Sequence, residues 1–169
     1  MRKKVIGILV VLLLVVFFSL GVCAKVKENQ THSPGLITYK VTIQIGSKQF
    51  DINNAGYMME ASPYIGNNRT MVPIGFIDTV FDYPKVISQD KKEITFKVKN
   101  MKIVIKIGSK DVLLKYENNT EYKVTLDAPA EIKDEIIFLP IRFISEKTGL
   151  RVSWYEKERK VIIDNKEEI

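Results

Sequence analysis

The chain has 169 residues, of which 46% are hydrophobic and 27% are charged, and these proportions exclude a collagen-like, coiled-coil-only or wholly disordered protein. Its formal charge is +6, and it contains one histidine and one cysteine. A disulfide needs at least two cysteines, and a His/Cys zinc site needs more ligands than one histidine and one cysteine. A Cys–His or Ser–His catalytic arrangement would depend on His32 alone, and a solvated linker histidine is the simpler interpretation.

The N-terminal segment 1–24 has the pattern of an export signal. Three basic residues at 2–4 precede an uncharged apolar stretch over 5–22, and the Val-Cys-Ala at 22–24 resembles a cleavage site. We expect a signal peptide at 1–24. An uncleaved membrane anchor is one alternative, because the stretch approaches the ~20 apolar residues that span a bilayer. A lipoprotein acylated at Cys23 is another, because Leu-Gly-Val-Cys at 20–23 resembles a bacterial lipobox. All three interpretations export the rest of the chain.

Removal of this segment changes the charge and the cysteine content of the mature chain. It takes away three basic residues and the cysteine, so 23 basic against 20 acidic residues leave a charge of +3. The mature domain then has no disulfide to stabilise it, and its stability must come from a hydrophobic core. About 145 residues suffice for such a core, because a chain of this size buries roughly 70% of its unfolded surface.

From residue 36 onward the chain repeats itself. Residues 43–48 return as 105–110 with five of six identical at an offset of 62, and residues 71–77 return as 138–144 at an offset of 67. The blocks have the same order in both copies, which indicates a duplicated unit. We expect a polar linker at 25–35, one domain at 36–165 built from two repeats with a shared core, and a polar tail at 166–169. The two repeats span about 36–100 and 101–165.

The elements of the first copy follow from its apolar spacing. Val41, Ile43 and Ile45 alternate with polar residues, which predicts a strand that ends at Gly46. A short strand over 70–72 and a weak helix come next. A hairpin closes the copy, with Val86 on one strand, a turn at 90–92, and Ile94, Phe96 and Val98 on the other.

The second copy repeats this order with a clearer helix. Strands are predicted over 103–107 and 136–139, and Pro140 stands where a first helical turn tolerates proline. Gly149 is a plausible C′ residue, and a hairpin over 152–154 and 161–163 closes the copy. One short helix per copy among many strands predicts an α+β fold with antiparallel β-sheets.

Two stretches of the chain resemble one known family. Residues 67–73 (Asn-Asn-Arg-Thr-Met-Val-Pro), and 139–146 (Leu-Pro-Ile-Arg-Phe-Ile-Ser-Glu) with Gly149, Val152 and Trp154, resemble the copper amine oxidase N-terminal-like, or stalk, domain. The family pattern has an N-G-R-T-hydrophobic-V-P-hydrophobic-R stretch, a short helix ending in L-G, and a V-x-W-D hairpin. This chain departs from the pattern at Asn68, Gly75, Thr148 and Tyr155.

The resemblance implies an accessory domain and not a catalytic one. The family takes its name from a stalk domain, and its members are common in exported proteins of Gram-positive-type bacteria. Copper amine oxidase chemistry needs three histidine ligands and a tyrosine-derived quinone, whereas this chain has one histidine and no Asn-Tyr dipeptide. We therefore expect no enzyme activity, no cofactor and no metal site.

Three groups of residues are candidates for ligand binding. Lys97, Lys99, Lys102 and Lys106 are predicted to share the outward face of two strands, as a basic stripe for an anionic polymer or as a solvated sheet face. Arg142 at the helix start could bind a carboxylate or phosphate, or could pair with an acid of the fold. Trp154 could be a carbohydrate platform or a core residue, and Tyr155 is the better candidate for an exposed stacking ring.

These observations favour a non-catalytic exported module that binds or spaces at the bacterial cell envelope. Its expected partners are a cell-wall polymer or another envelope protein. Membrane contact is expected only through the N-terminal segment. Nucleic acid is not expected, because export and a mature excess of +3 argue against it. The alternatives are a small secreted cell-wall hydrolase that uses unidentified carboxylates and a regulator that binds a partner protein.

Overall fold

The computed structural model of the chain describes residues 39–165. The predicted signal segment at 1–24, the linker at 25–35 and the tail at 166–169 lie outside the described residues, as do Cys23 and His32. Within 39–165, no helix has the length and apolar character needed to cross a bilayer.

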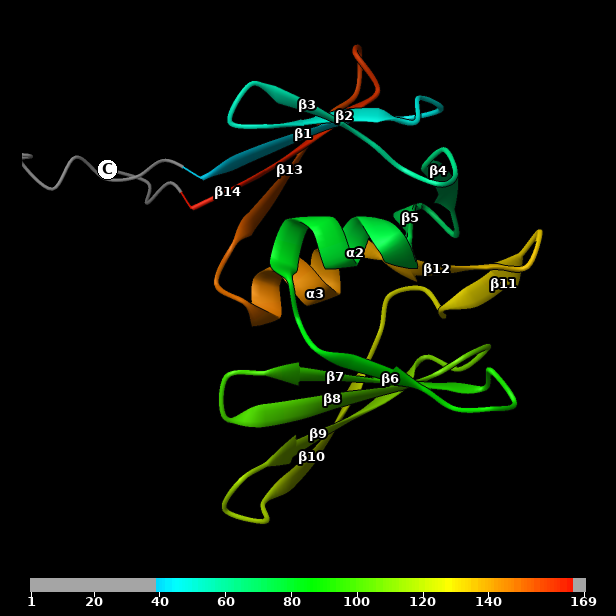
Figure 1. The fold of residues 1–169 in the computed structure, drawn as a ribbon, viewed down its shortest axis with the longest axis vertical. Coiled ribbons are helices and arrows are strands. Elements are labelled where there is room, and N and C mark those ends of the chain that lie inside the picture. Colours follow the sequence, from blue (N-terminus) through cyan, green and yellow to red (C-terminus); the bar gives the residue numbers. More distant parts are fainter. Residues whose placement is uncertain (1–38, 166–169) are drawn as a thin grey trace, which may run out of the picture. The chain divides into compact units, whose positions relative to one another are not determined.

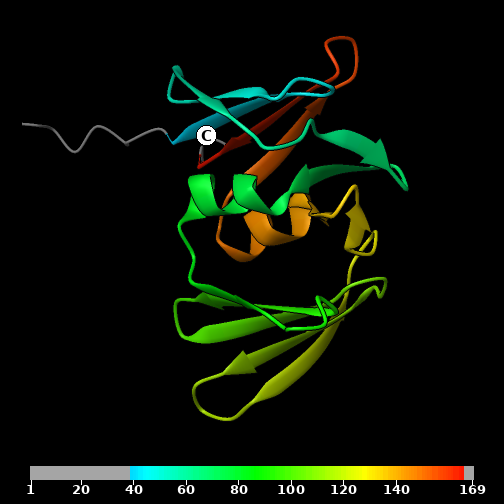
Figure 2. The ribbon, with the colours of Figure 1, turned by 45° about the vertical axis from the view of Figure 1, so that its right-hand side comes forward.

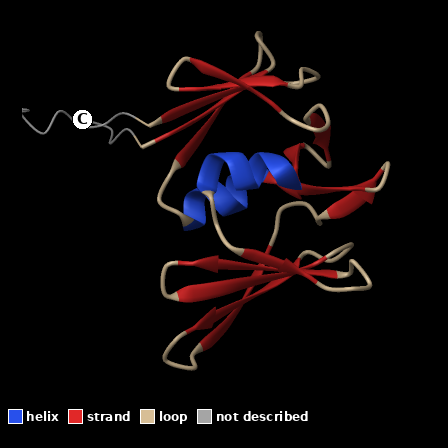
Figure 3. Cartoon of the chain, viewed as in Figure 1, coloured by secondary structure: helices blue, strands red, loops and turns tan. Residues whose placement is uncertain are grey.

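The described residues form three antiparallel β-sheets and two short helices (Figure 3). This confirms the predicted antiparallel sheets with short helices. Sheet A has the strand order β13 (Arg151–Tyr155), β14 (Lys160–Asp164), β1 (Lys40–Gln44), β2 (Gln49–Ile52) and β3 (Ala55–Met58). Sheet B has the order β11 (Glu131–Lys133), β12 (Ile136–Pro140), β5 (Arg69–Pro73) and β4 (Tyr64–Gly66). Sheet C has the order β10 (Glu121–Thr125), β9 (Asp111–Tyr116), β8 (Met101–Lys106), β7 (Glu93–Val98) and β6 (Lys85–Ile87). The helices are α2 (Ile74–Phe81) and α3 (Ile141–Lys147).

Long-range strand pairing joins the two ends of the domain. Sheet A combines β1, β2 and β3 with β13 and β14 from the far end of the chain (Figure 1). In sheet B, β5 lies antiparallel to β12, with Val72 directly opposite Leu139. Both side chains are fully buried, and the second offset of the sequence repeat relates their two positions. The two matching blocks therefore pair with each other at the centre of sheet B.

The helices lie between sheets A and C (Figure 2), and buried side chains from both sheets and both helices form the core. The inward side chains of the strands alternate with exposed ones, as Ile94, Phe96 and Val98 do on β7. From the helices, Phe76 and Ile77 of α2 and Ile141 and Ile144 of α3 complete one continuous cluster. Because α2 and α3 have only two turns each, this packing must hold them in place.

The two helices end in different ways. Gly149 follows α3 with φ of +86°, so its predicted role after the helix is confirmed. Pro140 is the N-cap residue of α3, one position before the first helical turn. At the end of α2, Asp82 adopts the left-handed conformation with φ of 49°, and its N–H donates to the carbonyl oxygen of Asp78. An aspartate thus takes the place of the glycine in the second copy.

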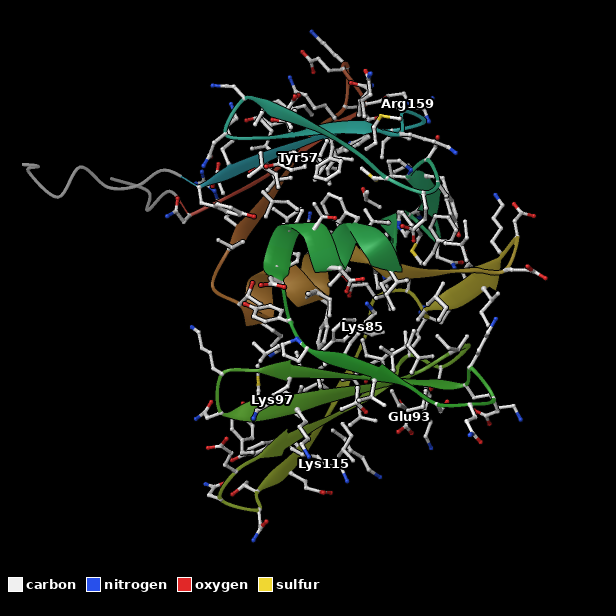
Figure 4. The ribbon with its side chains drawn as sticks, viewed as in Figure 1. Tyr57, Lys85, Glu93, Lys97, Lys115 and Arg159 are labelled. Carbon is white, nitrogen blue, oxygen red and sulfur yellow. The ribbon has the colours of Figure 1, made fainter. Side chains whose placement is uncertain are left out.

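The first hairpin forms as predicted, with Val86 on β6 opposite β7. The side chain of Val86 points outward and is 69% exposed. Lys85 is the residue opposite the buried Phe96, and its Nζ pairs with the carboxylate of Asp78 on α2. The long lysine stem can lie along the apolar face while its ammonium reaches the acid, so a charged residue occupies an inward position. Figure 4 labels Lys85 below α2.

Candidate functional site

A pocket of about 580 Å³ forms where β4, β5, α3, β13 and β14 meet. Three arginines line it: Arg69 is the first residue of β5, Arg142 lies at the start of α3, and Arg159 lies in the turn between β13 and β14. The indole of Trp154 and the carboxylate of Glu156 complete the functional groups. The remaining lining residues are Ile65, Asn68, Thr70, Ile141, Val152 and Val161.

Arg69 is held in position by two contacts. Its Nε donates to Oδ2 of Asp127 at 2.7 Å, and its Nη1 donates to the carbonyl oxygen of Asn68 at 2.9 Å. Asn68 has φ of 58°, so it occupies the left-handed turn position for which the family pattern uses glycine. The Arg69 and Asp127 side chains are 39% and 51% exposed, so their ion pair contributes only about 0–1 kcal/mol. Its main effect is to orient the guanidinium.

Arg142 and Arg159 keep their guanidinium groups open. Both side chains are exposed, and among residues 39–165 neither makes an ion pair or a side-chain hydrogen bond. The interpretation of Arg142 as the partner of an acid therefore has no support in the described part of the chain. Figure 4 labels Arg159 near the turn between β13 and β14. Two planar, bidentate donors thus line one hollow with one carboxylate, Glu156, among its lining residues.

Trp154 belongs to the core and to the pocket at once. It lies opposite the buried Val161 on β14, and its ring packs against the hydrophobic core. Its indole Nε1–H donates to the carboxylate of Glu156, two positions further along the chain. The ring is partly exposed and forms part of the pocket wall. This tryptophan is the only one in the sequence.

The corresponding position in the first copy is built differently. Gly75 is the counterpart of Arg142 in the repeat, and its N–H donates to Oε1 of Glu60 at 3.0 Å. A Cβ atom on Gly75 would lie 1.9 Å from Oε2 of Glu60. Arg69 likewise has Ile136 as its counterpart. A carboxylate therefore occupies the start of α2, whereas an arginine stands at the start of α3.

The other predicted site residues lie elsewhere. Tyr155 is 43% exposed on the outer face of sheet A, with Nζ of Lys160 5.3 Å from its ring centre. Lys97, Lys102 and Lys106 lie together on the outer face of sheet C. Lys99 does not join them, because it lies in the turn between β7 and β8 with φ of 51°. Within 39–165, no group of three or more His, Cys, Asp and Glu side chains could hold a metal ion.

The local sequence does not select Arg159 or Glu156 as site residues. Both lie in a polar turn, 156–159, which carries no signal beyond its hairpin position. The Asn-Arg-Thr motif at 68–70 is recognisable in the sequence, but its proximity to Arg142 depends on the β5–β12 pairing.

Comparison with protein families gives two matches along the chain. The model of the copper amine oxidase N-terminal domain matches residues 10–86 and again residues 85–163. The chain belongs to the copper amine oxidase N-terminal domain family. The comparisons with curated proteins and with solved structures found no match. The family pattern quoted above now has a spatial meaning, because its residues from both copies line one pocket: Asn68, Arg69 and Thr70 from the first and Arg142, Val152 and Trp154 from the second.

Proposed function

We propose that this protein is a non-catalytic, exported binding module of the bacterial cell envelope, and that its arginine-lined pocket holds a carboxylate-bearing saccharide. One observation carries the proposal. Residues of the family pattern from both copies line a single pocket, and Arg142 reaches it with no acid partner among the described residues.

The chemistry of the pocket suits a carboxylated sugar. A guanidinium presents parallel N–H donors that match the two oxygens of a carboxylate. Arg142 and Arg159 supply two such groups from different elements, and Trp154 adds an amphipathic ring against which a sugar can lie. Six of the eleven lining residues are polar or charged, so the pocket suits a hydrophilic ligand such as a sugar.

A binding role is favoured over a hydrolase by the acids of the pocket. Glycoside hydrolysis commonly uses two carboxyl groups about 5–9.5 Å apart, one on each side of the bond that breaks. Among the described residues that line the pocket, Glu156 is the one carboxylate, and it accepts the indole N–H of Trp154. The family is also defined by the N-terminal, stalk part of copper amine oxidases, which is apart from their catalytic chemistry.

Export and duplication are part of the same proposal. The basic and apolar residues at 1–24 direct the chain out of the cell, and the mature domain then meets wall polymers. The repeated blocks and the two family matches support an origin by duplication of one unit. The resulting domain is an α+β domain of two β-rich halves.

Sedimentation with purified peptidoglycan from which the stem peptides have been removed tests the proposal, because their removal frees the lactyl carboxylates of the glycan. The full chain, kept in a non-ionic detergent, is expected to sediment with this polymer and to be released by free N-acetylmuramic acid but not by N-acetylglucosamine. Arg142→Gln should weaken binding about tenfold or more, since a hydrogen-bonded charge contributes about 1.5–3 kcal/mol. Arg142→Lys should weaken binding to a similar extent, because lysine keeps the positive charge but lacks the parallel N–H donors of the guanidinium.

Lys157→Gln is the matched control. It removes the same charge from the exposed turn beside the pocket, and Lys157 does not line the pocket. Binding by this variant should equal that of the unaltered chain. Equal binding by Arg142→Gln, or release by both sugars alike, would refute the proposed function.

A further inference from the structure

The outer face of sheet C carries a row of lysines that lie directly opposite one another. Lys97 on β7 faces Lys102 on β8, and Lys102 faces Lys115 on β9. Their neighbours along each strand, such as Phe96 and Ile103, point the other way into the core. Adjacent strands lie about 4.8 Å apart, so the row spans roughly 10 Å across the sheet. Figure 4 labels Lys97 and Lys115 on this sheet.

Sheet A provides an internal comparison for this row. At the positions that correspond to Lys97 and Lys102, Asp164 on β14 lies opposite Lys40 on β1, and Arg151 on β13 flanks Asp164 on its other side. The first offset of the repeat relates Lys40 to Lys102, and the second relates Lys97 to Asp164. Nη2 of Arg151 lies 3.1 Å from Oδ1 of Asp164. The fold therefore accepts alternating charges at this row, and sheet C has a lysine where sheet A has the acid.

The lysine row works against the stability of sheet C. Like charges that are directly opposite on neighbouring strands destabilise a sheet, whereas opposite charges stabilise it. At the end of the row, Nζ of Lys115 lies 3.1 Å from Oε1 of Glu121. Within residues 39–165, Lys97 and Lys102 have no ion pair. The like charges of Lys97 and Lys102 thus oppose sheet stability with no ion pair to compensate, and such a conflict points to a role in binding.

The row lies between two hollows in the same face. The larger one, of about 660 Å³, has Thr95, Val104 and Leu113 at its floor, and Lys106 and Lys123 add to its positive charge. The smaller one measures about 450 Å³, and Lys102 and Lys115 line both hollows. Glu93 and Asp111 are the acids of the larger hollow, and Glu117 and Glu121 are those of the smaller one.

We propose that this lysine row binds a linear phosphodiester polymer without nucleobases that runs from one hollow to the other. Lysine ammonium groups act on phosphates as point charges, and three in a row can follow a repeating chain. No aromatic side chain lines the larger hollow and Tyr116 is the one aromatic residue that lines the smaller one, so successive nucleic-acid bases have no row of rings on which to stack. A recessed floor also suits a chain better than a flat lipid surface. This site is separate from the arginine-lined pocket and does not depend on the proposed function.

Binding of poly(glycerol phosphate), a linear phosphodiester chain without bases, to the full chain in non-ionic detergent tests the proposal. Three phosphate contacts predict a fall in affinity of about 20-fold between 50 and 200 mM salt. Lys97→Asp recreates opposite Lys102 the acid–lysine pair of sheet A, so it should raise the melting temperature while it weakens binding at least tenfold. Lys97→Gln should weaken binding less and reduce the salt slope by about one.

Lys48→Asp is the matched control, because it makes the same charge change in an exposed turn of sheet A. It should leave binding within about twofold of the unaltered chain. If Lys97→Asp and Lys48→Asp weakened binding equally, the change in net charge alone would explain the loss, and the proposal would be overturned. Unchanged binding by Lys97→Asp would overturn it as well. Tighter binding of oligo-deoxythymidine or of phosphatidylglycerol vesicles, with the same response to Lys97→Asp, would show that the occupant is wrong.

Discussion

The contact between Glu60 and Gly75 gives a double-mutant cycle with a definite sign. Oε1 of Glu60 accepts the N–H of Gly75 at 3.0 Å, near the start of α2, where Pro73 provides no side-chain cap. A Cβ on Gly75 would lie 1.9 Å from Oε2 and 2.7 Å from Cδ of the same glutamate. Gly75→Ala therefore has to displace the carboxylate and break its hydrogen bond.

Two effects oppose each other in Gly75→Ala. Alanine favours a helix over glycine by about 1 kcal/mol. Loss of the capping acceptor costs about 0.5–2 kcal/mol, and loss of a negative charge from the first turn adds about 0.3–1 kcal/mol. We expect Gly75→Ala to be neutral or destabilising by up to about 2 kcal/mol. In a Glu60→Ala background the same change should stabilise the protein by about 1 kcal/mol, since no carboxylate is left to displace.

Urea denaturation followed by far-ultraviolet circular dichroism measures the four corners of the cycle. The coupling free energy should be about 1–3 kcal/mol, which corresponds to several degrees in melting temperature for a domain of this size. Asp127→Ala with Arg142→Ala is the matched control at the counterpart positions of the second copy, and its two effects should add, because Asp127 pairs with Arg69. A coupling below about 0.3 kcal/mol for Glu60 and Gly75 would refute the capping role.

Two further predictions concern the central sheet. Leu139→Ala removes a fully buried side chain opposite Val72, so the free energy of unfolding should fall by about 2–5 kcal/mol in urea titrations; a loss below about 1 kcal/mol would contradict the buried β5–β12 centre. Burial and the hydrogen bond that its phenol donates to Glu131 raise the pKa of Tyr64 above the ordinary 10.0. The folded state then holds this proton more tightly than the unfolded state, so the stabilisation is present below pH 10 and falls as the pH rises above it. In denaturation at pH 8–11, Tyr64→Phe should lose stability less steeply than the unaltered chain above pH 10. Equal slopes would contradict the assignment.

Elements with a clear apolar period were predictable from the sequence. The strands around Asn100 and the helix between Pro140 and Gly149 lie where the alternation and the turn residues placed them. Strand β3 was not predicted, because all four of its residues are exposed and it carries no inward-facing pattern. The inward position of Lys85 was also not predictable from the sequence, because it depends on the ion pair with Asp78 on α2.

The candidate site depends on pairings that local pattern does not encode. Arg69 and Arg142 each stand in a family motif, one in each copy of the repeat. They line the same pocket because β5 pairs with β12 and α3 follows β12 directly. Trp154 and Arg159 join them through the β13–β14 hairpin, which pairs with β1 at the other end of the domain. Such long-range register follows from packing of the whole core.

Fluorescence of Trp154 tests the central claim most directly, because this is the one tryptophan of the chain and it lines the pocket. Titration of the full chain in non-ionic detergent with N-acetylmuramic acid should give a saturable change in its emission. N-acetylglucosamine should give none at the same concentrations, and Arg142→Lys should abolish the response to the acid. An unchanged spectrum, or an equal response from Arg142→Lys, would contradict the account of this pocket as a site for carboxylated saccharides.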